Sequence, residues 1–510
     1  MNTTTLEQIE AQAEKLAATA TALTRTCREA GLSDFSLDWG CVPPGVPHEV
    51  DHLRRKTLAS VTRLQAMLAG PPDFIQHIAH QVQISFSAIS LSHLSWSANK
   101  DTVKIPERCP GLTEFVVPQT QILACLRWLG EFQVLACIPP SGEAMGTKDL
   151  ADLVSVPEAQ LRRVVRLMTT VGFLVLEEPP QQAIGTRQAQ VAHTRLSASF
   201  VTQFSNLDAV MFLSETVVHA ALHMPEATQR QLSGFSLVST PVGLDFGTAC
   251  KQQPWLRRQW DAYLGCLRDP NQVIADLLAR LDWESLGRAL VVEIDSFSTE
   301  LAQSLAERHP SLRWIVQMSG PEAAKYERDT GIPVGSGSIS LEKLTSPGKL
   351  GIEVQLRAPH TPQMIKDAAV YLVRSPSDLD SQALAAWVQA ALQCHLAVLR
   401  ADPDALLLLA VQLRPDPGSV DPAVVALACI RSMTIAQLTG GTAEMDLATL
   451  EQLIGRVRDS NNGGLVVSNK LHNSHCSTIA LGIKYVSRPP PPEPLAVVDP
   501  SLGWGGISSP

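Results

Sequence analysis

Two groups of side chains have residue types and spacing that could hold a metal ion. His219 and His223 are four residues apart on an expected helix, with Glu215 one turn earlier, so all three can share one helix face. The second group comprises His472, His475 and Cys476. A zinc-protease helix needs a glutamate directly after its first histidine, and Ala220 stands there. We interpret both groups as ordinary interior or interface residues and expect no metal site.

Other catalytic signatures are missing from the sequence. The ten cysteines contain no CxxC pair, which argues against a structural zinc site and a disulfide framework. No GxSxG elbow occurs, and the glycines at 335–337 precede neither a lysine nor a helix start, as a phosphate-binding loop requires. The longest strongly apolar run, 405–411, is too short to span a bilayer, and the N-terminus lacks a secretory pattern. We expect an intracellular protein without membrane segments.

Three arginines lie where a DNA-reading protein would place base and phosphate contacts. Arg162, Arg163 and Arg166 fall on the third helix expected of a winged-helix fold. One interpretation is contact with DNA or a partner; the other is a solvated face opposite Leu161 and Val165. We favour the solvated face, because 41 Lys and Arg against 50 Asp and Glu give a net charge of −9 without wider basic clusters.

The elements that precede this region are helical. Residues 1–83 contain two amphipathic patterns, and two such helices need a partner surface, so we predict a homodimerisation region. The apolar stripe of the first helix is Leu6, Ile9, Ala13, Leu16, Ala20, Leu23 and Cys27. Residues 84–119 are rich in serine and proline and predict a surface insertion, or a translated intron.

Residues 120–204 predict a winged-helix domain. We expect one helix over ILACLRWLGEFQVLACIP, a second over 147–154, and a third with Pro157 in its first turn that ends near Gly172. The segments FLVLEE and QVAHTRLS supply the wing. A helical connector over 205–285 follows.

Residues 286–487 predict a doubly wound, Rossmann-like sheet, because β-rich runs alternate with helical patterns. The expected strands are 289–294, 312–318, 352–356, 370–374 and 406–412, with 465–469 and 478–486 as an antiparallel pair. The expected helices lie near 299–308, 320–328, 381–400 and 421–438. The Pro-rich residues 488–510 are expected to be disordered. The fold class is therefore α/β plus all-α.

This architecture resembles the small-molecule O-methyltransferases that use S-adenosylmethionine. In that family a glycine-rich turn follows the first strand, an acid ends the second, and a histidine after the fourth is the general base. Here Glu293 keeps the acidic position of the first strand, but Met318 and Ser375 replace the later acid and the histidine. The glycine positions hold Asp295, Ser296, Phe297 and Thr299. The resemblance thus implies the fold with cofactor binding and catalysis lost.

Long collinear blocks also resemble the aflatoxin-cluster transcriptional co-activator family of filamentous fungi (AflS/AflJ-like). They include LACLRWLGEFQVLACIP, ALVVEIDSFSTELAQSLAERHPSLRWIVQ and GGLVVSNKLHNSHCSTIALGIKYV, and the resemblance covers about 1–83 and 120–486. It implies a non-catalytic co-regulator of a fungal polyketide gene cluster, of the aflatoxin or sterigmatocystin kind. Such a protein binds a zinc-cluster DNA-binding activator, contacts DNA only indirectly, and acts in the nucleus with a cytoplasmic pool. No catalytic residue, cofactor or metal belongs to that role.

A methyltransferase-like enzyme of secondary metabolism is the alternative. Its pocket, built from 205–235 and the loops after the strands, would carry methyl transfer or a cyclisation that does not consume S-adenosylmethionine. The same pocket could instead sense a pathway metabolite.

Overall fold

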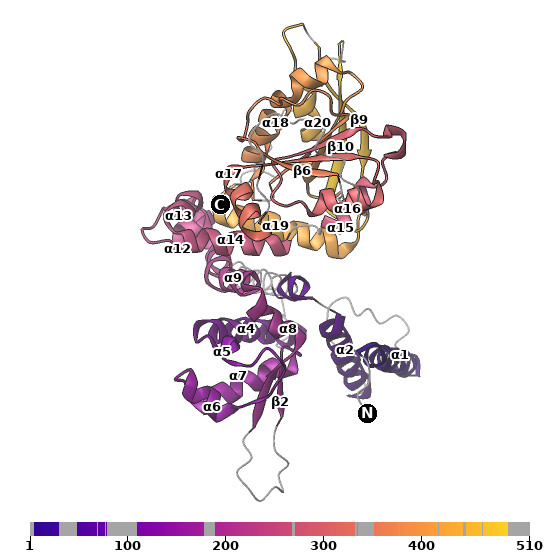
Figure 1. Ribbon diagram of the computed structural model, residues 1–510. Coiled ribbons are helices and arrows are strands. Elements are labelled where there is room, and N and C mark those ends of the chain that lie inside the picture. The colour runs from indigo at the N-terminus through magenta and orange to yellow at the C-terminus, as the bar shows by residue number, and fades with distance from the viewer. Residues whose placement is uncertain are drawn as a thin grey trace, which may run out of the picture. The chain divides into compact units, whose positions relative to one another are not determined.

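The computed structural model divides into two compact units. Unit 1 contains residues 1–267 and 436–440, and unit 2 contains 268–435 and 441–510 (Figure 1). The structure describes residues 5–29, 48–68, 70–76, 78, 110–177, 189–267, 271–331, 334, 351–376, 378–416, 418–441, 445–461 and 463–487. Most of the predicted insertion, the 335–337 glycines and the predicted Pro-rich tail therefore lie outside the described residues.

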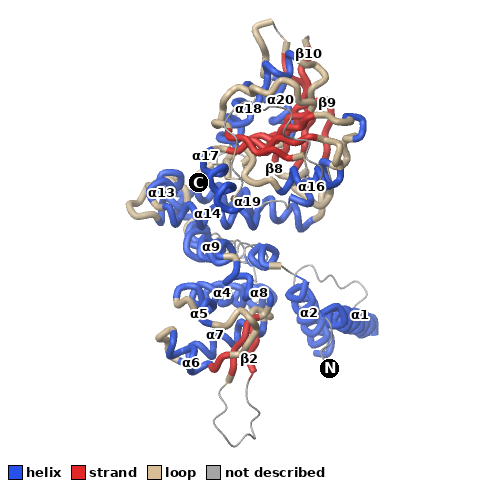
Figure 2. Tube along the Cα trace, viewed as in Figure 1, coloured by secondary structure: helices blue, strands red, loops and turns tan. Residues whose placement is uncertain are grey.

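Unit 1 is mostly helical, with one small sheet (Figure 2). Its helices are α1 (Thr5–Glu29), α2 (His48–Leu68), α4 (Pro110–Glu131), α5 (Val134–Cys137), α6 (Thr147–Leu153), α7 (Glu158–Thr170), α8 (Arg195–Thr202), α9 (Phe204–Phe212), the π-helix η1 (Leu213–Val217), α10 (Val218–Leu222), α11 (Met224–Arg230), α12 (Gly234–Val238), α13 (Phe246–Gln252) and α14 (Pro254–Leu267). Its strands are β1 (Met145–Gly146), β2 (Leu174–Glu177) and β3 (Gln190–His193).

Helices α1 and α2 pair through a partly polar seam. Gln12 and Thr19, seven residues apart, are buried, and Gln12 Nε2 donates a hydrogen bond to Ser60 O at 3.2 Å. Leu6, the first residue of the predicted apolar stripe, is 72% exposed. The rest of the stripe follows the seam more closely, because Ile9, Leu16 and Leu23 are half-buried on the helix face that carries Gln12 and Thr19.

The small sheet and its helices have the order that the sequence predicts for a winged helix. The strands pair antiparallel in the order β1-β3-β2, and α7 buries Leu161, Val165 and Met168. Pro157 is the N-cap of α7, one position before the predicted first turn.

Two helix boundaries near the first winged-helix helix differ from prediction. Helix α4 begins at Pro110, so residues 110–119 of the predicted insertion are helical. The run expected to form one helix is broken, because Gln133 has φ 53° and caps α5 in the left-handed region. A residue with that φ ends one helix and starts the next in a new direction.

Helices α10 and α12 approach each other closely at Gly234. A Cβ there would lie 2.4 Å from Ala220 O, a backbone atom that cannot rotate away. We expect Gly234→Ala to lower the free energy of unfolding by about 1–3 kcal/mol. Gly265→Ala in α14 is the matched control: its Cβ meets nothing within 4 Å, and we expect stabilisation of up to about 1 kcal/mol. Urea denaturation compares the two; equal effects would contradict the close approach.

Unit 2 is a three-layer α/β unit. Its helices are α15 (Asn271–Leu278), the 3-10 helix η2 (Glu284–Leu286), α16 (Glu300–Arg308), α17 (Gly320–Thr330), α18 (Ser381–Ala401), α19 (Pro422–Thr439, whose last turn belongs to unit 1) and α20 (Leu447–Gly455). Its strands are β4 (Leu290–Ile294), β5 (Arg313–Met318), β6 (Ile352–Leu356), β7 (Val370–Arg374), β8 (Leu406–Gln412), β9 (Gly464–Leu471) and β10 (Thr478–Val486). Every predicted strand is present, whereas α20 was not predicted.

The seven strands form one sheet in the order β6-β5-β4-β7-β8-β10-β9. Strands β4 to β8 are parallel, and β10 is antiparallel to both β8 and β9. Alternate residues of each strand face opposite layers: Val292 packs with α18 and α20, and Val291 with α15 and α16. Figure 1 shows these helix pairs on the two sides of the sheet. This confirms the predicted doubly wound architecture.

Helices α18 and α19 have the length and hydropathy of membrane-crossing helices. Helix α18, however, packs Leu384, Val388 and Leu392 into the core on one face of the sheet. That core accounts for the apolar character of α18, since a helix that is buried between strands can have the same length and hydropathy as a membrane-crossing helix.

Candidate functional site

The carboxyl ends of the parallel strands are where an open α/β sheet binds its ligands. In unit 2 this edge contains an ion pair between Glu293 of β4 and Arg374 of β7. Arg374 Nη2 lies 2.8 Å from Glu293 Oε1, and the two side chains are 9% and 0% exposed. Glu293 and Arg374 face the layer of α15 and α16. Each lies two residues after a strand residue that packs in that layer, Val291 in β4 and Leu372 in β7, and side chains two residues apart on a strand point to the same side. Glu293, the acid of the first strand, is therefore neutralised from within the sheet.

Further hydrogen bonds fix this pair. Ser296 Oγ donates to Glu293 Oε1 at 2.8 Å, and Arg374 Nη1 donates to Asn271 Oδ1 at 2.9 Å. The Arg374 guanidinium also lies 4.7 Å from the centre of the Phe297 ring, a cation–π contact. Of the turn residues that replace glycines, Ser296 thus completes the ion-pair network and Phe297 covers it.

Asp295 takes the left-handed backbone conformation, with φ 51°. The turn therefore keeps a conformation that favours glycine while carrying a charged side chain. That side chain pairs with Arg357, which follows β6: Arg357 Nη1 lies 3.0 Å from Asp295 Oδ1. Thr299 is buried and accepts a hydrogen bond from Gln303 Nε2 at 3.1 Å. The four side chains at the glycine positions, those of Asp295, Ser296, Phe297 and Thr299, thus each have a structural contact within unit 2.

Two further positions lack the groups that methyltransferase chemistry needs. Met318, the last residue of β5, is fully buried in the core and presents no acceptor to a ribose. Ser375 extends β7 by one backbone hydrogen bond, from its N–H to Ala410 O at 2.9 Å. Pro376 and Asp378 follow it, and Ser377 lies outside the described residues.

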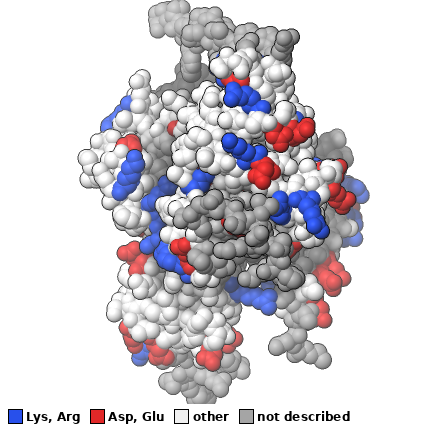
Figure 3. Space-filling view, turned by 45° about the horizontal axis from the view of Figure 1, so that its top comes forward, with Lys and Arg blue, Asp and Glu red and all other residues white. Residues whose placement is uncertain are grey.

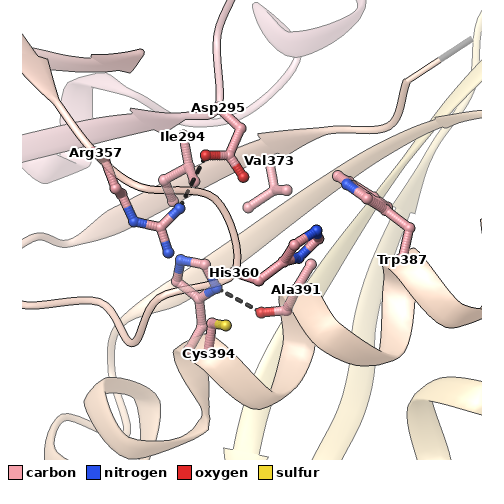
Figure 4. Close-up of a pocket in the computed structure, with 9 residues that line it drawn as sticks. Ile294, Asp295, Arg357, His360, Val373, Trp387, Ala391 and Cys394 are labelled. Carbon is pink, nitrogen blue, oxygen red and sulfur yellow. Dashed lines mark hydrogen bonds and ion pairs between the residues drawn. The ribbon is translucent and has the colours of Figure 1, made fainter. Parts of the chain in front are cut away.

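The space left between β4, β7, α18 and the loop after β6 is very small. Asp295, Arg357, His360, Trp387, Cys394 and His395 are among the side chains that line it (Figure 4). The cavity measures about 10 Å³, which is room for about one water molecule. S-adenosylmethionine, which the fold implies, is many times larger. Because Glu293 and Asp295 are also paired with arginines, the residues that the structure describes at this edge do not fit that cofactor.

The winged-helix arginines share one side of α7 but are unequally exposed. Arg163 and Arg166 are exposed on α7, whereas Arg162 is half-buried. On the face of the molecule in Figure 3, basic and acidic side chains of the described residues are interspersed. A DNA-binding face usually concentrates basic residues.

The histidine groups have local hydrogen-bond partners. His219 Nδ1 bonds to Glu215 O at 3.0 Å, and His223 Nδ1 to His219 O at 2.9 Å, so both rings bind their own helix. His475 Nδ1 lies 2.7 Å from Asp421 Oδ2. Among the described residues no group of three His, Cys, Asp or Glu side chains is arranged to hold a metal.

Comparison with known proteins gives two consistent results. The model of the trypacidin cluster transcriptional coactivator tpcD N-terminal domain matches residues 6–69, the span of α1 and α2. A transcriptional coactivator of Pseudocercospora fijiensis is 43% identical over 73% of this chain and 98% of its own length. The dothistromin biosynthesis regulatory protein aflJ of Dothistroma septosporum is 32% identical over 94% of this chain and 98% of its own length.

The chain belongs to the family of fungal secondary-metabolite cluster transcriptional coactivators. The resemblance stated from the sequence is therefore confirmed. The fold of this coactivator is also found in LepI, whose structure in complex with SAH and a substrate analogue matches with a TM-score of 0.53 at 16% identity. That match covers 86% of the coactivator chain and all of LepI, and at such identity it shows the fold alone.

Sequence reasoning missed the two arginines that fill the site. Arg374 was assigned only as the end of a strand, and Arg357 and His395 were not singled out. The available signal was a charged residue at the end of an otherwise apolar strand, VYLVR, two residues beyond Leu372, which pairs with Glu293 of the neighbouring strand. A charge that is buried at such a position needs a partner.

Proposed function

We propose that this protein is a non-catalytic transcriptional coactivator of a fungal polyketide gene cluster, and that it acts by binding the cluster's zinc-cluster DNA-binding activator. The observation that carries the non-catalytic part is the edge of unit 2, where Arg374 and Arg357 pair with the acids Glu293 and Asp295. The regulatory part rests on relatives that are named as a coactivator and a regulatory protein. The similarity to this chain extends over nearly the whole length of each relative.

The segments then have separate roles in this proposal. Residues 1–83 would form a homodimer, 120–204 the winged helix, and 205–285 a connector to the methyltransferase-like domain at 286–487. The activator would bind the latter domain, and Arg162, Arg163 and Arg166 would contact DNA or the partner only within the larger complex. Nuclear action with a cytoplasmic pool follows from that role. Residues 84–119 remain an insertion or a gene-model artefact in this proposal, with their last ten positions helical.

Gene deletion separates the coactivator from the enzyme alternative. Loss of a coactivator should lower the transcripts of the neighbouring cluster genes. Loss of an enzyme should leave those transcripts intact while a pathway intermediate accumulates. Affinity purification of the tagged, complementing protein should recover the zinc-cluster activator; intact transcripts after deletion would reject the proposal.

Cofactor binding provides an independent prediction. Isothermal titration of the purified full chain with S-adenosylmethionine should give no heat of binding at cellular cofactor concentrations, since the arginine pairs fill the strand edge. A methyltransferase-fold enzyme titrated in parallel is the positive control. Micromolar binding would favour the enzyme alternative and direct the search to a substrate pocket.

A further inference from the structure

Helix α1 has an exposed apolar side that α2 does not cover. Helix α2 packs on the side of α1 that carries the buried residues Gln12 and Thr19 (Figure 1). We propose that the exposed side binds the same side of α1 in a second copy of the chain, with the two helices antiparallel. This inference rests on the homodimer of the proposed function and names its contact surface.

The exposed side, here called the outer flank, consists of Leu6, Ala13, Ala17 and Ala20. These residues follow one another at intervals of seven, four and three positions, which places them on one side of a helix. Leu6 is 72% exposed, Ala13 and Ala17 are exposed, and Ala20 is half-buried. Three of the four side chains are those of alanine, and small side chains at a contact let two helix axes come close.

Charged residues border the outer flank, and their sign changes along the helix. Glu7, Glu10 and Glu14 lie in the N-terminal half, and Arg25 and Arg28 lie in the C-terminal half. All five are exposed. Glu10 and Arg28 are 18 residues apart, as are Glu7 and Arg25, so each pair spans whole turns and points in the same direction.

The helix dipole accounts for only part of this pattern. It favours an acid in the first turn and a base in the last turn, which are Glu7 and Arg28 here. Glu10 and Arg25 lie beyond those turns, where the dipole effect has fallen off. Arg25 Nε does lie 3.8 Å from Glu29 Oε1, but the two side chains are 73% and 69% exposed, so this pair contributes little.

A second copy of α1 complements these charges when it runs antiparallel. With the centre of the contact between residues 17 and 18, Glu10 faces the partner's Arg25 and Glu7 faces the partner's Arg28. Both pairs occur twice, because a two-fold axis makes the contact self-complementary. A parallel arrangement would instead set acids against acids, which is unfavourable.

Charge reversal in the full chain tests this contact by analytical ultracentrifugation. R25E/R28E and E7R/E10R should each raise the dissociation constant of the homodimer by about tenfold or more, because like charges then face each other. An equimolar mixture of the two variants should restore association, because acids again face bases in the mixed dimer. Association that the mixture does not restore would overturn the contact and assign this side of α1 to a different partner.

A matched control separates the contact from a general effect of charge. K15E/K148E makes the same change in net charge as R25E/R28E, at two exposed sites off the outer flank. Its dissociation constant should stay within about twofold of the wild type, since exposed charges away from a contact are screened. An increase equal to that of R25E/R28E would overturn the proposal.

Cross-linking with L6C tests the orientation. Residue 6 and Cys27 lie about 30 Å apart within one helix, so a short bismaleimide can join them only between two copies. An antiparallel contact brings residue 6 within one turn of the partner's Cys27, and mass spectrometry should identify that linked peptide pair. A link between the two copies of residue 6, or no link to Cys27, would overturn the antiparallel contact.

The ultracentrifugation also distinguishes this inference from the proposed function. A wild-type chain that stays monomeric would reject both the proposed homodimer and the outer flank as its surface. A homodimer that neither α1 variant weakens would reject the outer flank alone. Cluster transcripts after gene deletion test the coactivator role independently of either result.

Discussion

Replacing Arg374 with alanine is expected to destabilise unit 2 by about 3–5 kcal/mol, because the buried carboxylate of Glu293 then loses its counter-charge. Glu293 is 0% exposed, and its Oε2 already has no hydrogen-bond partner among the described residues. The carboxylate cannot rotate into water, so the protein must either protonate it or open the β4 turn. Urea denaturation measures the loss.

Two variants make this prediction specific to the buried pair. Arg257 and Asp261 form an ion pair whose side chains are 52% and 50% exposed, and R257A should change stability by no more than about 1 kcal/mol. The double variant R374M/E293Q removes both charges and should recover part of the R374A loss. An R374A loss as small as that of R257A would show that Glu293 does not depend on the arginine.

Acidification is expected to destabilise the protein through His395 by about 3 kcal/mol between pH 7 and pH 4. Burial lowers the pKa of His395 to about 4, and the positive charge of Arg357 acts in the same direction. An unfolded histidine titrates near pH 6.5, so the unfolded chain binds a proton before the folded chain does. The stability contribution is therefore complete above about pH 6.5 and is lost as the pH falls towards 4.

The difference between variants isolates this effect from other titrating groups. H395N keeps a side-chain N–H near the position that bonds Ala391 O but cannot titrate, so its stability should fall less with acid than that of the wild type. H219N changes an exposed histidine and should follow the wild-type curve. Parallel wild-type and H395N curves from pH 7 to pH 4 would show that His395 is not the group responsible.

The central strands of unit 2 were predictable because each has a short apolar run between breakers, and burial on both faces requires such runs. Strand β8, LLLLAVQ, is an example. Helix α20 was missed because it has nine residues, and its apolar face, Leu450 and Ile454, is too short for a clear period. The break at Gln133 was missed because the nearest glycine, Gly130, lies within α4 and the left-handed residue itself is a glutamine.

From the sequence, the candidate site was predictable only as a methyltransferase site that has lost its cofactor-binding residues. The sequence shows that Asp295, Ser296 and Phe297 stand where glycines were expected. What fills the edge instead depends on register: Glu293 and Leu372 are paired across β4 and β7, which brings Arg374 past the end of β4. Arg357 is 62 residues from Asp295, and local patterns do not contain contacts of that range. The arginines therefore became interpretable only with the sheet assembled.

The strand order has a consequence for how this chain is synthesised. Strand β8 pairs with β10, and β10 is also the strand partner of β9 among the described strands, although β9 leaves the ribosome first. Until residues 478–486 emerge, β8 exposes the hydrogen-bonding edge of a strongly apolar strand, and β9 lacks that strand partner. A polypeptide that terminates between 471 and 478 would therefore contain all the parallel strands and still be prone to aggregation.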